Sequence, residues 1–303
     1  MTLVNAVVQG IFLGGYYAVL ACGLSIMFGV MRTINLAHGD VAVLGAYITF
    51  VIVDRTGVSA FVAFLVAVPV MLVLGYVLQV TILERSLRSG ILTPLLATFG
   101  LSIVIQNLLL ITFSPDVRSL GGSAGAVTTA GWHLTSDLSV SALGILVLVV
   151  AAVVFGAVHL FLSRTRAGWA LRATAEDADA AELVGIDSRA MHARATAIAV
   201  AIAALGGLFL AIRSVFDPFS GPIQLIFAFE AVVIGGMGSL WGTLVGGIAL
   251  GVAQTLGAQI HPQYAALAGH VLFLVVLIVR YGGGRASLPR LRGVVALGRA
   301  SRQ

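Results

Sequence analysis

Apolar runs long enough to cross a lipid bilayer occupy most of this chain and constrain its fold more than any other feature. A transmembrane helix needs about 20 apolar residues, and the hydrocarbon core admits only elements whose backbone polar groups are satisfied internally. The sequence therefore predicts an all-α polytopic membrane protein with about nine spans, within a range of about eight to ten. The segments are 3–30, 36–53, 60–83, 93–113, 139–162, 195–213, 223–239, 243–259 and 263–280. The range reflects the first and seventh segments, each of which could be a broken or re-entrant helix.

One charged stretch, residues 163–195, interrupts this apolar pattern. It holds five arginines and five acids, although the whole chain has only 17 basic and 12 acidic side chains. A charge at the centre of a bilayer costs several kcal/mol, so this stretch must lie outside the membrane.

Arginine placement predicts the orientation of the spans. Cytoplasmic loops are enriched in basic residues, which places Arg85 and Arg88, the 163–195 stretch and the C-terminal tail inside the cell. The loop 114–139 carries only Arg118 and is expected outside. These constraints predict an N-terminus outside and a C-terminus inside.

The domain organisation is expected to be simple. Residues 1–283 should form a single transmembrane domain, with 163–195 as a cytoplasmic loop, and residues 284–303 a basic cytoplasmic tail. The arginines of that C-terminal region fit an orientation anchor that meets anionic lipid headgroups, so the net charge of +5 does not indicate nucleic acid.

Lysine is absent from the sequence, and this excludes two kinds of chemistry. A phosphate-binding P-loop requires a lysine after its glycines, so this chain is not itself a Walker-type ATPase. Schiff-base catalysis through lysine is excluded as well. No nucleophile–base pair and no metal-ligand spacing is evident, so we expect neither an enzyme nor a metal site.

Local signals predict structure within the charged stretch. Thr174 and Asp177 fit a capping box, which predicts a short helix over about residues 175–184. Gly185 is expected to end that helix, and Asp187 or Ser188 to cap the next one. Two interpretations remain open: a solvated connector, or a small helix that docks on a cytoplasmic partner.

Glycines interrupt the apolar pattern in two places, residues 23–47 and 232–251. Transporters place unwound backbone at such interruptions, where it lines a cavity or is buried in protein. The second stretch fits equally well a helix hairpin packed by small residues. The candidate hinge or broken-helix glycines are Gly29, Gly39, Gly235, Gly236 and Gly238.

Polar residues within apolar segments are the candidates for a substrate pathway, because such residues are costly in a membrane. Amides often only bond neighbouring helices, so a structural role stays open for each. Glu230 is the one acid deep in an expected span, and its candidate partners are Arg213 and Arg32. The candidates are Asn35, His38, Gln106, Asn107, Glu230 and Gln254.

Three motifs together resemble those of a known family. They are GLSIMFGVMRTINLAHGDVAVLGAY, RTRAGWALRATAEDADAAELVGIDSRAM and VVIGGMGSLWGTLVGGIALGVAQ, in this order. With them the chain resembles, over nearly its whole length, the permease subunits of branched-chain amino acid ABC transporters of the high-affinity, binding-protein-dependent type. Urea and short-amide transporters of the same superfamily share these motifs, so the solute remains open.

The resemblance implies a location, partners and a mechanism. It implies a multi-pass protein of the bacterial cytoplasmic (inner) membrane, working by alternating access with a second permease, two ATP-binding subunits and an extracytoplasmic substrate-binding protein. ATP and magnesium would be bound by the partner subunits, with no cofactor in this chain. The resemblance also assigns the contact with the ATPase to the segment 173–187, represented by Thr174, Glu176, Asp177, Ala181, Glu182, Leu183, Val184, Gly185 and Asp187.

A function of another class remains open from the residues alone. The chain would then be a stand-alone secondary transporter or channel, with Glu230 as its proton or cation site. Transport by the isolated polypeptide, driven by an ion gradient, separates this alternative from an ATP-driven importer.

Overall fold

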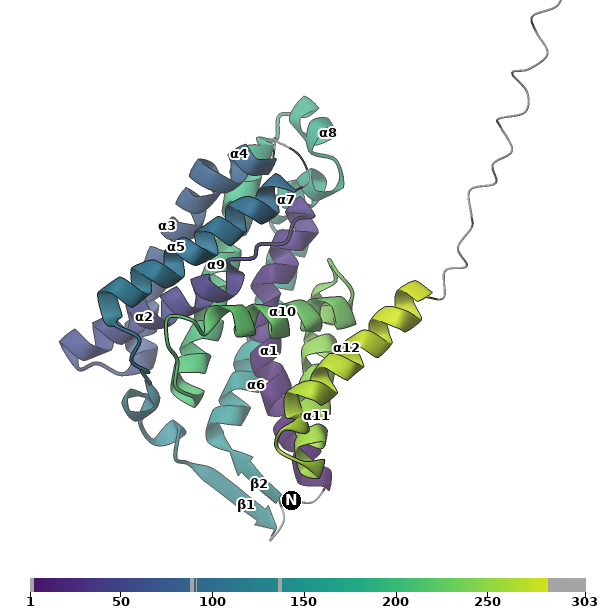
Figure 1. Ribbon diagram of the computed structural model, residues 1–303. Helices are drawn as coiled ribbons and strands as arrows, with labels where there is room; N and C mark the ends of the chain where they lie inside the picture. Colours follow the sequence, from purple (N-terminus) through teal and green to yellow (C-terminus); the bar gives the residue numbers. More distant parts are fainter. Residues whose placement is uncertain (1–2, 88–89, 91, 136–137, 283–303) are drawn as a thin grey trace, which may run out of the picture.

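The computed structural model describes residues 3–87, 90, 92–135 and 138–282 (Figure 1). A helix covers most of each expected apolar segment. These helices are α1 (Leu3–Met31), α2 (His38–Thr56), α3 (Ala60–Leu78), α5 (Thr93–Phe113), α6 (Ala142–Arg164), α9 (Ser188–Arg213), α10 (Gly221–Gly235), α11 (Leu240–Ile260) and α12 (Tyr264–Gly282). The basic tail 284–303 and Arg88 lie outside the described residues.

Six helices of the described chain are long and apolar enough to cross a membrane: α1, α3 with its continuation to Leu87, α5, α6, α9 and α11. The others differ for separate reasons. Helix α10 has only 15 residues, and α2 carries the charged residues Asp40, Asp54 and Arg55. The polytopic membrane class is therefore confirmed, whereas nine crossings and the orientation of the termini remain predictions.

Helix α1 lies at the centre of the bundle, and 78% of its most apolar window is buried inside the protein. Its glycines allow other helices to approach closely, as small residues do in membrane proteins. A β-carbon at Gly14 would collide with the backbone at Gly247 and Ile248, and one at Gly251 would collide with the backbone of Gly10 and Gly14. Helices α1 and α11 are therefore in backbone contact.

The first expected segment, residues 3–30, is not broken, and the interruptions of the helices lie elsewhere. Helix α1 is continuous to Met31, and the chain turns at Arg32, which has a φ of 52°. Helix α3 continues through a π-helix (η1, Gln79–Leu83) into α4 (Glu84–Leu87). The expected span 223–239 is wrong in its extent, because α10 ends at Gly235 and a turn with positive φ at Gly236 and Gly238 follows.

The segment between α5 and α6 contains structure that an all-α expectation omits. A 3₁₀ segment, η2 (Gly121–Val127), precedes strands β1 (Gly131–Thr135) and β2 (Leu138–Ser141). The strands pair antiparallel, with Gly131 opposite Ser141 and Trp132 opposite Val140. The described chain is thus mostly helical with one small hairpin.

The hairpin and the beginning of α1 lie at one end of the molecule, and α4, α7 (Arg166–Glu176) and α8 (Ala178–Leu183) lie at the other (Figure 1). The loop expected outside and the charged stretch expected inside are therefore at opposite ends of the bundle. Helix α10 lies across α1 rather than along it, between these two ends.

Candidate functional site

A buried carboxylate, Asp40, joins α2 to α5. Asp40 as a whole residue is only 1% exposed. Ser102 Oγ donates a hydrogen bond of 2.6 Å to its Oδ2, and Gln106 Nε2 donates one of 3.0 Å to its Oδ1. Both oxygens therefore have a donor, which offsets part of the cost of burying the group.

Asp40 was not among the candidates from the sequence, although Gln106 was. The sequence signal for Asp40 is its position in the interrupted stretch 23–47, two residues after His38. Asn107, the neighbour of Gln106, is exposed, and its side chain donates to the Ile103 carbonyl on its own helix. The two amides thus lie in different environments.

The other two candidates near α2 contact the backbone. His38 is fully buried, and its Nε2 lies 2.9 Å from the Leu20 carbonyl of α1. Asn35 Oδ1 accepts a hydrogen bond of 3.0 Å from the Ala37 amide, just before α2 begins. These contacts fix the connection between α1 and α2.

A second polar group lies where α1, α10, α11 and α12 meet. Tyr17 Oη donates a hydrogen bond of 2.7 Å to Gln254 Oε1. Glu230 pairs with His270, with 2.5 Å between Oε1 and Nδ1, rather than with Arg213 or Arg32. On the preceding residue of α1, Tyr16 Oη donates a hydrogen bond of 2.6 Å to Gln224 Oε1.

Two atoms of this second group are buried without a hydrogen-bond partner among the described residues: Glu230 Oε2 and Gln254 Nε2. The Glu230 side chain is 4% exposed, whereas that of His270 is 46% exposed. His270 thus connects a buried acid to the surface of α12. Sequence reasoning missed His270, because its pairing with Glu230 depends on how α10 and α12 pack.

The candidate hinge glycines serve different purposes in the fold. Gly39 lies where α2 crosses α10, and a β-carbon there would collide with the Gly221 carbonyl. Gly235 packs against the backbone of Gly242, whereas Gly236 and Gly238 adopt φ of 97° and 86° in the turn between α10 and α11. Gly29 lies within α1, close to Gly238.

The charged stretch forms a folded projection with defined caps. The expected Thr174 cap is wrong, because Thr174 lies inside α7 and is buried. Asp177 instead caps α8, and its Oδ1 accepts a hydrogen bond of 3.0 Å from the Ala180 amide. Gly185 follows α8 with a φ of 86°, as expected. The expectation for Asp187 is also confirmed, because it caps α9 through the Ala190 amide at 3.1 Å.

The projection presents acids and two apolar side chains to its surroundings. All five of its acids are exposed, while Thr174 and Ala181 face inward; the acids are Glu176, Asp177, Asp179, Glu182 and Asp187. Leu183 and Val184 are 90% and 77% exposed. Ser188 Oγ donates a hydrogen bond of 3.1 Å to the Ala178 carbonyl, and this bond connects α8 to the start of α9. This surface is suited to a protein partner, since it lies beyond the apolar helices.

Within the described part of the chain, no group of three or more His, Cys, Asp or Glu side chains could hold a metal ion. The polar side chains instead link helices inside an apolar bundle, and the folded acidic projection extends from one end of it. Together with the six apolar helices, this arrangement defines a polytopic membrane protein.

Comparison with known proteins gives the family. The family model for the permease component of branched-chain amino acid transport systems matches residues 6–280. The high-affinity branched-chain amino acid permease BraD of Pseudomonas aeruginosa is 32% identical, with 94% of this chain and 96% of BraD covered. LivH of Escherichia coli is 29% identical, with 93% and 96% covered. A probable branched-chain amino acid permease of Methanocaldococcus jannaschii is 24% identical, with 78% and 75% covered.

Among solved structures, PsaBC from Streptococcus pneumoniae in complex with Fab covers 93% of this chain at 14% identity and a TM-score of 0.48. At that TM-score the likeness carries no conclusion about the fold. The match over residues 6–280 does establish the family: the chain belongs to the branched-chain amino acid transport permeases, and it is a multi-pass membrane permease.

Proposed function

We propose that this chain is the membrane-spanning permease of an ATP-driven importer that moves branched-chain amino acids across the cytoplasmic membrane. The names of its relatives BraD and LivH support the solute class. Urea and short amides are the alternative solutes. The partners in this proposal are a second permease, two ATP-binding subunits that hold ATP and magnesium, and an extracytoplasmic substrate-binding protein.

The acidic projection carries the proposal for coupling. Leu183 and Val184 extend from a capped and fastened turn, surrounded by exposed carboxylates. Exposed apolar side chains with a polar rim are typical of protein interaction sites. The segment 173–187 would follow the ATP-binding subunits as they close, so that their movement reorients the helices around a central pathway. Such coupling requires different contacts in the two states.

The polar groups within the bundle are candidates for the pathway. Asn35, His38, Gln106, Glu230 and Gln254 remain proposed on the grounds of their burial in the bundle, and Asp40 joins them through its bonds to Gln106 and Ser102. Asn107 remains proposed only as the neighbour of Gln106, because its side chain is exposed. His38, Glu230 and Gln254 have the strongest individual support, because each has a buried side-chain atom without a hydrogen-bond partner among the described residues.

The test is uptake by the reconstituted complex with its ATP-binding subunits and binding protein. We expect ATP-dependent accumulation of leucine, isoleucine or valine, with urea and a short amide as competitors. Stronger competition by urea or the amide than by leucine would overturn the solute assignment.

One observation favours a second candidate, an ion-coupled transporter. The contact between Glu230 and the half-exposed His270 is an arrangement that could carry a proton. Vesicles that contain this polypeptide alone decide between the two: uphill accumulation driven by a proton gradient would replace the ATP-driven proposal.

A further inference from the structure

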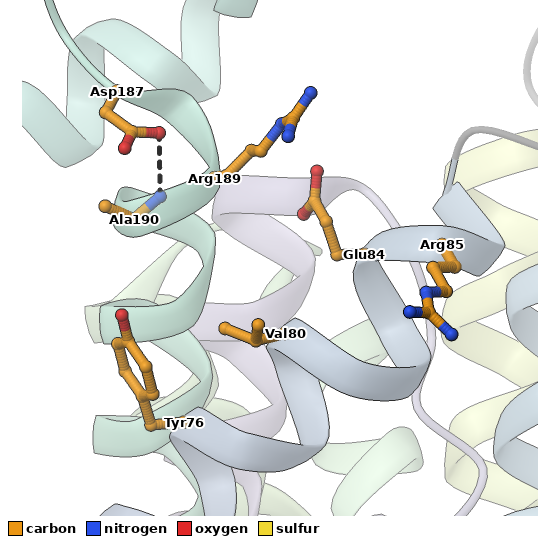
Figure 2. A pocket seen from close by; sticks show the side chains of 7 residues that line it. All are labelled: Tyr76, Val80, Glu84, Arg85, Asp187, Arg189 and Ala190. Carbon is orange, nitrogen blue, oxygen red and sulfur yellow. Dashed lines mark hydrogen bonds between the residues drawn. The ribbon is translucent and has the colours of Figure 1, made fainter.

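A groove of about 410 Å³ lies beside the acidic projection, between the end of α3 and the beginning of α9 (Figure 2). Its lower wall carries Tyr76 and Val80, which are 45% and 49% exposed. Charged side chains surround its upper part. The residues that line it are Tyr76, Val80, Glu84, Arg85, Asp187, Arg189 and Ala190.

Contacts between the two walls give the groove a fixed shape. Thr196 Oγ1 of α9 donates 2.7 Å to Gln79 Oε1 at the start of the π-helix. One turn further, His192 Nδ1 lies 3.4 Å from Glu84 Oε2. The π-helix adds a residue to one turn, which shifts the following side chains. The groove is thus built mainly by helices, and Asp187 enters it as the N-cap of α9.

The groove crosses the boundary between an apolar and a polar environment. Tyr76, Val80 and Arg85 all belong to the apolar helix Ala60–Leu87. Arg85 lies near its end, nine residues beyond Tyr76, or about 13 Å along the helix. Tyrosine is enriched at membrane–water interfaces, and arginine at the level of the headgroups. Acyl chains can therefore lie on Val80 while a headgroup lies at the level of Arg85 and Arg189.

The charges of the groove select among headgroups. Arg85 and Arg189 are matched by two carboxylates, Glu84 and Asp187, so the lining is formally neutral. Tyr76 and Arg189 are both exposed, and the Tyr76 hydroxyl and the Arg189 guanidinium are donors suited to a phosphate. Asp187 uses Oδ1 to cap α9 and keeps a second oxygen for a cation.

We propose that this groove binds a zwitterionic phospholipid with a primary ammonium headgroup, such as phosphatidylethanolamine. Arg189 and Tyr76 hold the phosphate, and Asp187 accepts a hydrogen bond from the ammonium group. Phosphatidylglycerol lacks the ammonium and would bring a net negative charge to the two carboxylates. Phosphatidylcholine has no N–H to donate. Under the orientation proposed above, the lipid belongs to the cytoplasmic leaflet, but its binding does not depend on which solute is carried.

The experiment uses the full chain, purified in mild detergent and delipidated. Native mass spectrometry then follows titration with equimolar phosphatidylethanolamine, phosphatidylglycerol and phosphatidylcholine of matched acyl chains. We expect the first lipid to be retained in preference to the other two. Arg189→Gln should weaken its retention about tenfold, because a charge-assisted hydrogen bond is lost. Asp187→Asn retains a capping side chain and should abolish the preference over phosphatidylglycerol.

Arg164→Gln is the matched control, since Arg164 is an exposed arginine at the same end of the bundle and outside the groove. It should leave the lipid preference unchanged, and thermal melting verifies that every variant is folded. Equal retention of the three lipids by the unaltered chain overturns the proposal. So does an Arg189→Gln chain that retains phosphatidylethanolamine but loses its ATP-binding partner, because the groove would then be a protein-docking site.

Discussion

Substitution of the exposed tip of the projection tests the coupling proposal most directly. Leu183 and Val184 are 90% and 77% exposed, so nearly all of their apolar surface is available to a partner. Complete burial of a side chain of this size contributes about 1.5–3 kcal/mol. Val184→Asp removes that contribution and places a carboxylate in the contact, which adds a desolvation cost. We therefore expect a loss of at least about 1.5–3 kcal/mol, or roughly 10- to 100-fold in affinity for the ATP-binding subunit.

The measurement is substrate-stimulated ATP hydrolysis by the reconstituted complex, together with the amount of ATP-binding subunit that copurifies. Because Val184 makes little contact within this chain, the melting temperature of the permease should change little. Val215→Asp is a matched control, since Val215 is 60% exposed and lies just beyond α9, at the opposite end of that helix. If Val184→Asp and Leu183→Asp both leave stimulated hydrolysis intact, the assignment of 173–187 as the coupling segment is refuted.

Three further substitutions test the packing of the bundle. Gly39→Val should lower the unfolding free energy by about 1–3 kcal/mol, because the new side chain would collide with the Gly221 carbonyl; thermal melting compares it with Gly122→Ala, where nothing lies within 4 Å. Gly236→Ala forces a β-carbon into a φ of 97° and should cost about 1–2 kcal/mol, whereas Gly156→Ala, in open space, should not destabilise the protein. Asp40→Asn turns an amide donor toward Ser102 or Gln106 and should cost about 1–3 kcal/mol, against little change for Asn107→Leu; equal melting temperatures would contradict the buried bonds.

Local features of this fold were predictable from the sequence because they depend on a few consecutive residues. The Asp187 cap and the glycine stop at Gly185 are of this kind. The Thr174 cap failed for the same local reason. Two side chains three residues apart, Thr174 and Asp177, can both begin a helix, and the chain continues α7 through the first and begins α8 at the second. Sequence alone does not rank these two positions.

The errors in the helix boundaries have a different cause. Around Gly236 the run 223–239 has no charged residue, since its only charge is Glu230, so hydropathy does not mark the turn that begins at Gly236. The pairs inside the bundle depend on long-range packing. Asp40 and Gln106 are 66 residues apart, and Glu230 and His270 are 40 residues apart. No spacing rule for a single helix joins such pairs, which is why Gln106 and Glu230 were recognised without their partners.

Helix α9 is the element that connects the projection to the far end of the protein. Its first turn is capped by Asp187 beside α8, and its 26 residues extend about 39 Å. Near its end, the Ala211 carbonyl accepts a hydrogen bond of 2.7 Å from the Leu120 amide, in the loop between α5 and α6 at the opposite end of the bundle. The Arg213 guanidinium lies 5.8 Å from the centre of the Tyr16 ring. A β-carbon at Gly207 would collide with the Ala42 carbonyl, so α9 is also in backbone contact with α2. A displacement of the tip would therefore move α2 and the opposite loop through one continuous helix, and under the proposed function α9 transmits the closing of the ATP-binding subunits.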